Sequence, residues 1–124
     1  MTPPSPPQAV RSLDELRDRL RAFAAARDWD QFHSPKNLAM ALIAEAAELV
    51  EHFQWLTEDQ SRILPPAKAA EVADELADVL IYLVRIADKL GIDLCAAASA
   101  KMDRNEDKYP ARVVKGSARK YTEY

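Results

Sequence analysis

The chain has 124 residues, 48% hydrophobic and 30% charged, and is long enough to bury a core without disulfides. It contains only two glycines and one cysteine, which excludes Rossmann and P-loop glycine motifs, a disulfide framework and a cysteine-rich zinc site. The formal net charge of -3 argues against binding to a nucleic-acid polymer, and no apolar run is long enough to span a membrane.

Four of the eight prolines lie before residue 8, and residues 1–11 are predicted to form a disordered leader. The leader lacks the charged-then-apolar pattern of a secretion signal, which favours a cytoplasmic location. The first helix is predicted to begin at Ser12, where Glu15 gives a capping-box pattern, and to run to about Arg27.

Three further helices are predicted from local signals. Ser34 and Pro35 mark the start of the first, Gly91 marks the end of the second, and Asp93 can cap the third. Their predicted ranges are 35–56, 66–90 and 93–108. Residues 29–33 and 57–66 are predicted to be connecting loops, and residues 111–124 show no clear period. Four helices with short links, without the alternation typical of strands, predict an all-α, antiparallel four-helix bundle-like domain over residues 12–124.

Acidic residues interrupt the apolar stripes of two predicted helices. Glu45 falls inside the leucine stripe of residues 35–56, and Glu48 lies at its edge; Glu75 and Asp78 repeat this spacing in residues 66–90. A buried carboxylate needs a partner, and the only cation in residues 35–56 is Lys36, near their start. Such pairs usually lie on a solvated face, but two matching pairs also describe a site for a hard cation, Mg²⁺ first and Mn²⁺ second.

A di-iron site is the alternative metal centre. Such bundles carry Glu-x-x-His on two helices. Here His52 follows Glu48 by four residues, and residues 66–90 contain no histidine. The pattern therefore favours Mg²⁺ over iron.

The apolar residues of the helix over 66–90 predict both a core face and a second surface. The predicted core face is Val72, Leu76, Val79, Leu80, Leu83, Ile86 and Leu90. The residues that lie off the core stripes of the two acidic helices are Met40, Ile43, Val50, Ile81 and Val84. Exposed apolar patches commonly mark interfaces, so this second set predicts an oligomer.

Charge and aromatic patterns add candidate substrate contacts. Residues 101–124 carry seven basic and four acidic side chains, whereas residues 45–93 carry four basic and eleven acidic ones. A basic segment can bind phosphate oxygens, although a solvated helix face is the commoner explanation. Aromatic side chains such as Trp29 and Trp55 can stack on a base, although core packing is commoner.

Two acid motifs and several longer blocks occur in order along the chain. E-x-x-E spans Glu45 to Glu48, and E-x-x-D spans Glu75 to Asp78. The longer blocks are RDWDQFH at 27–33, FQW at 53–55, DVLIYL at 78–83, KMD at 101–103 and GSARKY at 116–121. In this pattern the chain resembles the MazG-like superfamily of all-α nucleoside triphosphate pyrophosphohydrolases, and within it the dCTP pyrophosphatase branch.

The resemblance implies Mg²⁺-dependent hydrolysis of a nucleoside triphosphate, dCTP or a modified dCTP in particular, to the monophosphate and pyrophosphate. It implies that Glu45, Glu48, Glu75 and Asp78 are metal ligands, and that Glu45 or Glu48 is the catalytic carboxylate that orients water. The substrate-binding residues that it implies are Trp29, His33, Trp55, Tyr82, Lys101, Asn105, Lys108 and Arg119. Close relatives of that branch carry a histidine where this sequence has Leu20.

The resemblance also implies dimers that often pair into tetramers, with the site at a subunit boundary, so a homotetramer is predicted. The alternative function is a non-catalytic helical module that binds nucleotides or proteins. Such a module is expected to lack at least one metal-binding acid, and all four acids are present.

Overall fold

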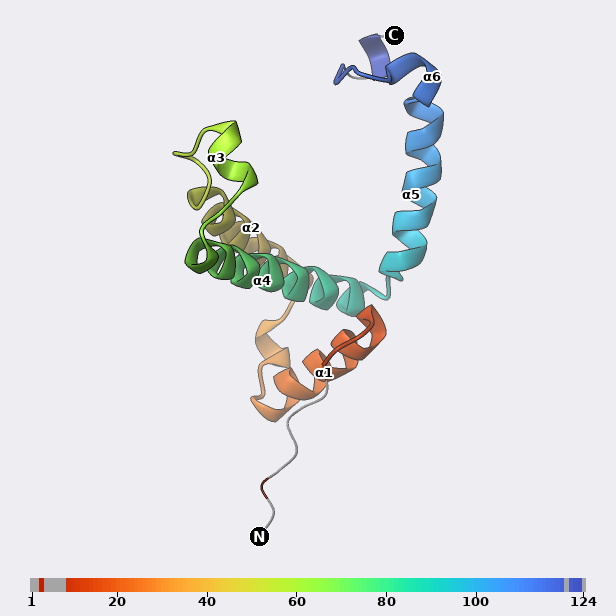
Figure 1. Cartoon of the computed structure of the whole chain (residues 1–124). Helices are drawn as coiled ribbons and strands as arrows, with labels where there is room; N and C mark the ends of the chain where they lie inside the picture. Colours follow the sequence, from red (N-terminus) through yellow and green to blue (C-terminus); the bar gives the residue numbers. More distant parts are fainter. Residues whose placement is uncertain (1–2, 4–8, 120, 124) are drawn as a thin grey trace. The chain divides into compact units, whose positions relative to one another are not determined.

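The computed structural model describes residues 3, 9–119 and 121–123, and all regular structure in this part of the chain is helical (Figure 1). Most of the predicted leader, residues 1–11, lies outside the described residues. The chain divides into two compact units between Gly91 and Ile92. The single domain predicted for residues 12–124 therefore stays a prediction. None of the described helices is long and apolar enough to cross a membrane.

The four predicted helices are present, and shorter helical segments accompany them. The first unit contains α1 (Leu13–Ala26), the 3-10 turn η1 (Asp30–Phe32), α2 (Pro35–Glu51), α3 (Glu58–Arg62) and α4 (Pro66–Leu90). The second unit contains α5 (Leu94–Lys108), α6 (Ala111–Val114) and the 3-10 turn η2 (Tyr121–Glu123). The all-α prediction is confirmed.

Side chains cap the helices at the predicted starts. Ser12 Oγ accepts a hydrogen bond from the Glu15 N–H at 3.1 Å, and Ser34 Oγ accepts one from the Asn37 N–H at 3.1 Å. Each bond satisfies one of the backbone donors that a helix start leaves without a helical partner. At the end of α4, Gly91 adopts a left-handed φ of 66°, which glycine reaches without steric cost.

The segment between α2 and α4 differs from the prediction. α2 ends at Glu51 rather than near Leu56, and turns follow it. The predicted loop contains α3, which is closed by a capping box. Thr57 Oγ1 accepts from the Gln60 N–H at 3.1 Å, and Gln60 Oε1 accepts from the Thr57 N–H at 2.9 Å. The sequence signal for this short helix was the T-x-x-Q pattern.

α4 is the central helix of the first unit, and both α2 and α1 pack against it (Figure 1). His52, just past the end of α2, lies 3.7 Å from Glu71 near the start of α4. Arg21 of α1 donates to Asp88 near the end of α4 at 2.8 Å. Thus the C-terminal end of α2 lies near the start of α4, and α1 packs near the end of α4.

The core side of α4 differs in part from the predicted one. Val72 is buried as expected, but Leu76 and Leu80 are 52% and 40% exposed in the chain. Val84, predicted to lie outside the core, is only 3% exposed. The physical reason is that α4 carries apolar residues around most of its circumference. α1 and α2 cover the side that carries Val84 and Ala87, which leaves much of the leucine stripe outside.

Candidate active site

Three carboxylates from two helices converge in the first unit. Glu45 and Glu48 of α2 and Glu75 of α4 each place an oxygen within 4.8 Å of the others. The i, i+3 spacing directs Glu45 and Glu48 to one side of α2. Because α2 and α4 run antiparallel there, Glu75 of α4 meets this side. The structure thus brings together three of the four predicted metal ligands.

Asp78, the fourth predicted ligand, lies one helical turn beyond Glu75 on α4. It is not among the three acids that converge within 4.8 Å. Its charge nevertheless acts on the cluster, because it contributes to raising the pKa of Glu45. Asp78 also lines the adjoining cavity, so it stands between the acidic cluster and that cavity.

Glu45 lies at the centre of the negative charge of the cluster. Burial raises the pKa of Glu45 to about 7, helped by Glu48, then by Glu75 and by the charge of Asp78. One oxygen each of Glu45 and Glu75, Oε2 in both cases, is buried without a hydrogen-bond partner in the described part of the chain. Buried carboxylate oxygens without a donor are costly unless a cation or a proton compensates them.

This donor set fits a divalent metal ion. Carboxylate oxygens are hard ligands of the kind that Mg²⁺ and Mn²⁺ take. A cation would pair with the two orphaned oxygens, and its charge would offset the burial and the neighbouring acids that raise the pKa of Glu45. The geometry therefore supports the predicted site for a hard divalent cation. The three converging residues are all glutamates, so no histidine is among them.

His52 lies beside the cluster. Its Nε2 is 3.7 Å from Glu75 Oε1, and its Nδ1 is 3.3 Å from the Lys68 ammonium. Lys68 also pairs with Glu71 at 3.1 Å. This polar group borders the acids on the side toward the start of α4. Sequence reasoning considered His52 only as an iron ligand, and the spacing gave no indication of this neighbouring position.

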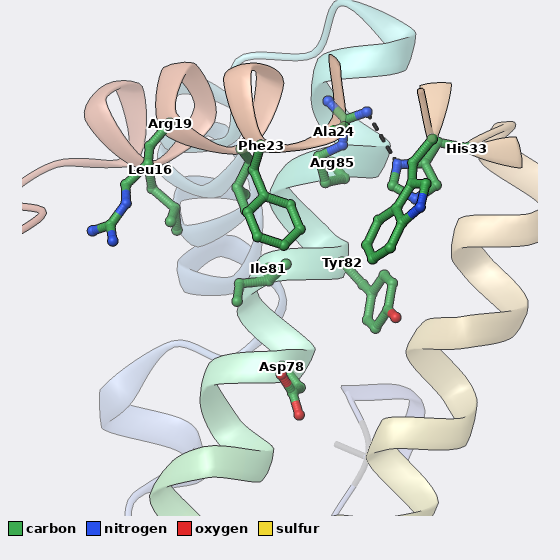
Figure 2. A pocket seen from close by; sticks show the side chains of 11 residues that line it. Leu16, Arg19, Phe23, Ala24, His33, Asp78, Ile81, Tyr82 and Arg85 are labelled. Carbon is green, nitrogen blue, oxygen red and sulfur yellow. Dashed lines mark hydrogen bonds between the residues drawn. The ribbon is translucent and has the colours of Figure 1, made fainter. Parts of the chain in front are cut away.

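A cavity of about 490 Å³ adjoins the acids and is walled by α1, α4 and the connector between α1 and α2 (Figure 2). Its polar and aromatic lining residues include His33, Asp78, Tyr82 and Trp29, and its apolar ones include Leu16, Leu20, Phe23 and Ile81. Burial raises the pKa of Tyr82, and the charges of Glu45 and Asp78 raise it further. Asp78 lines the cavity, and Tyr82 in its wall is close enough to feel the charge of Glu45, so the cavity lies beside the acidic cluster.

Trp29 and His33 belong to an aromatic cluster in the cavity wall. The Trp29 ring packs edge-on against Phe23 at a centroid distance of 5.6 Å and against His33 at 6.2 Å. The backbone N–H of Trp29 donates to Ala24 O at 2.9 Å, which fixes the position of this residue. A left-handed Asp28, with φ 52°, turns the chain just before it. The wall thus offers flat apolar surface of the kind that a base can contact.

Arg85 is a lining residue that sequence reasoning missed. It is 3% exposed, and its guanidinium donates to Asp30 at 2.8 Å. A signal was present, because the polar stripe of α4 continues past Tyr82 at the same steps of three and four. Its members are Glu71, Glu75, Asp78, Tyr82, Arg85 and Lys89. The stripe is acidic under α2 and basic near α1 and η1.

The remaining predicted substrate contacts lie elsewhere. Trp55 follows α2 in the first unit, is 87% exposed and does not line the cavity. Lys101, Asn105 and Lys108 lie on α5 in the second unit, and Arg119 lies after α6. Lys101 is exposed and Asn105 is half-buried. The roles of these residues toward a substrate stay predictions.

Comparisons with known proteins are consistent with this geometry. The MazG-like family model matches residues 41–124. dCTP pyrophosphatase 1 from Mus musculus is 46% identical over 114 residues, which are 90% of this chain and 67% of that protein. The Homo sapiens dCTP pyrophosphatase 1 has the same identity and coverage. The crystal structure of a pyrophosphatase from Archaeoglobus fulgidus DSM 4304 matches with a TM-score of 0.76 and 40% identity, covering 86% of this chain and 99% of that one.

Proposed function

The chain belongs to the MazG-like family, and we propose that it is a metal-dependent hydrolase that cleaves a nucleoside triphosphate to the monophosphate and pyrophosphate. The preferred substrate is dCTP or a modified dCTP. One observation carries the proposal: three carboxylates from two helices converge beside a cavity walled partly by aromatic rings. A role in removing unwanted nucleotides follows from that substrate class.

The metal would be Mg²⁺, with Mn²⁺ as the alternative, held by Glu45, Glu48, Glu75 and Asp78. When bound, such a cation neutralises charge on the phosphate oxygens and so stabilises the transition state of phosphoryl transfer. Support comes from the two buried carboxylate oxygens that lack a donor in the described part of the chain.

The protein's own side chains would position the attacking water and the base. Glu45 or Glu48 would orient the attacking water, since a carboxylate oxygen not used for metal binding can accept its proton. Trp29, His33 and Tyr82 would hold the base in the cavity. Leu20, in the same wall, adds an apolar surface where the dCTP pyrophosphatase branch carries a histidine.

Residues outside the cavity complete the proposed site. Lys101 and Asn105 would contact the phosphates and sugar, and Lys108 and Arg119 would add positive charge. Trp55 would contact the base of a site shared between subunits, which its 87% exposure in one chain permits. We propose a homotetramer built from two dimers, and a cytoplasmic location.

Substitution of the acids tests the metal assignment. Glu48→Gln and Asp78→Asn are each expected to reduce pyrophosphate release by about two orders of magnitude or more, because each removes a charge that holds the cation. Both should also weaken Mg²⁺ binding measured by calorimetry. Asp74→Asn is the matched control, since Asp74 is an exposed acid of the same helix outside the converging group. Full activity in either site variant would refute the assignment.

A further inference from the structure

Arg85 of α4 is a buried cation, and its hydrogen bonds reach a ring in the cavity wall. Its side chain is 4% exposed. Nη2 donates to Asp30 Oδ1 at 2.8 Å and lies 3.2 Å from His33 Nδ1 (Figure 2). One guanidinium nitrogen, which carries two hydrogens, therefore serves both partners.

The chemistry of arginine decides the direction of the second bond. A guanidinium has five donors and no acceptor, and it does not lose its proton in proteins. His33 Nδ1 must therefore be the acceptor, so it carries a lone pair and no hydrogen. In a neutral imidazole with Nδ1 unprotonated, the proton resides on Nε2.

We propose that Arg85 is a positioning residue that holds His33 as the neutral Nε2–H tautomer, so that the cavity wall offers an N–H donor to the ligand. The expected partner is an acceptor atom of a nucleobase, such as a carbonyl oxygen or an unprotonated ring nitrogen. Only this identification of the ligand rests on the proposed function. The tautomer follows from the contacts of Arg85 alone.

The surroundings of His33 agree with a neutral ring. Burial lowers the pKa of His33, and the charge of Arg85 lowers it further. Lys89 acts in the same direction from α4, while Asp30 opposes both. Asp30 is itself shared between the two cations, because Lys89 Nζ also donates to its Oδ1 at 2.9 Å. The carboxylate is therefore engaged by cations, and the ring nitrogen receives a donor.

Nitrogen-15 NMR of the imidazole rings tests the tautomer directly in the ligand-free protein. The chain has two histidines, so a His33→Asn spectrum assigns the signals. At about pH 7 we expect the Nδ1 of His33 to resonate as an unprotonated nitrogen and Nε2 as a protonated one. A protonated Nδ1, in either a neutral or a charged ring, would overturn the proposal.

Variants of α4 test the role of Arg85. Arg85→Met should mix the two tautomers and raise the pKa of His33 toward its ordinary value. Lys89→Met is the matched control, because it removes the other cation from Asp30 but no donor to His33; its His33 should keep the Nε2–H pattern. An unchanged His33 spectrum in Arg85→Met would contradict the assignment. If Arg85→Met does not fold, Arg85→Lys replaces it, since lysine lacks the planar fork that reaches both partners.

Steady-state kinetics separate this inference from the proposed function. A glutamine amide can place a donor near the position of Nε2, whereas an asparagine amide is too short. With dCTP, His33→Asn should raise KM about fivefold and His33→Gln by less than about twofold, the size expected of one neutral hydrogen bond. Equal losses in both variants would refute the donor role. Absence of turnover in the wild type would refute the proposed function, and the NMR result would still decide the tautomer.

Discussion

At the scale of single residues, Glu45 combines burial, neighbouring acids and an oxygen without a donor among the described residues. A raised pKa means that the folded, metal-free protein binds a proton at Glu45 more tightly than the unfolded chain does. The resulting stability is fully present below the unfolded pKa and is lost as pH rises through about 7. A cation in the site would compensate the buried negative charge of Glu45 and so remove this loss of stability.

Glu45→Gln should therefore stabilise the metal-free protein at alkaline pH. We expect a gain of about 1–2 kcal/mol at about pH 8, less than the full pKa shift implies because the exposed Glu48 lets solvent screen the pair. Urea unfolding in EDTA at about pH 5 and about pH 8 measures the gain, which should shrink at the lower pH. If the free energy of unfolding changed equally with pH in wild type and variant, the pKa of Glu45 would not be raised in the folded protein.

Proton release accompanies metal binding for the same reason. Because a cation needs the ionised carboxylate, Mg²⁺ must displace the proton that Glu45 holds near neutral pH. Calorimetric affinity for Mg²⁺ should rise between about pH 6 and about pH 8, and the heat should vary with the ionisation enthalpy of the buffer. A pH-independent affinity would contradict the acid cluster as the binding site.

At the scale of elements, the connector between α1 and α2 is tied to α4 through Asp30. This side chain accepts from Arg85 at 2.8 Å and from Lys89 at 2.9 Å. Hydrogen bonds from Lys89 and then Arg85 lower the pKa of Asp30, so its contribution to stability is present above the ordinary aspartate pKa and is lost as pH falls. The tie positions both Trp29 and His33 in the cavity wall.

Asp30→Asn should loosen this connector. We expect a lower melting temperature at neutral pH and faster hydrogen exchange at the His33 N–H, which donates to Asp30 O at 3.1 Å. The difference from wild type should narrow in acid, where Asp30 is protonated. Asp28→Asn is the matched control, because asparagine tolerates the left-handed φ of 52° and Asp28 pairs with neither cation. Equal exchange rates in wild type and Asp30→Asn would show that the ion pairs do not hold the connector.

How far each element could be predicted depends on how local its cause is. Ser12, Ser34 and Asp93 act on backbone groups three residues away, so the starts of three helices followed from the sequence. The end of α2 at Glu51 did not, because the leucine pattern continues past it to Leu56. The meeting of Glu45 with Glu75 was predictable from matching spacing. The contacts of Asp30 and His33 with Arg85 depend on how α1 and its connector pack on α4, which no local pattern specifies.

At the scale of the whole molecule, large apolar side chains remain exposed on one chain. Met40 and Ile43 of α2 are 61% and 65% exposed, and Leu76 and Leu83 of α4 are 52% and 42% exposed. Sequence periodicity identified these residues as apolar stripes. It did not show which stripe packs within the chain, because α4 is apolar on more than one side. Exposed stripes of this kind support the proposed assembly.

Light scattering tests the assembly. The wild type should have the mass of a tetramer, and Ile43→Asp should shift it toward a smaller species, because a charge at a buried interface loses solvation without a partner. Circular dichroism of the variant should remain helical, since Ile43 is 65% exposed in the single chain. A stable monomer mass for the wild type would refute the homotetramer.

The most direct test of the central claim is pyrophosphate release from a panel of deoxynucleoside and nucleoside triphosphates, with Mg²⁺ and with EDTA. The carboxylate cluster beside the aromatic cavity predicts release that needs Mg²⁺ and is strongest with dCTP or a 5-modified dCTP. Mg²⁺-dependent release that favours another base would keep the hydrolase and reject the substrate, with Leu20 as the first residue to exchange. No release from any nucleotide, in protein that is folded and binds Mg²⁺, would contradict the account and indicate a non-catalytic binding module.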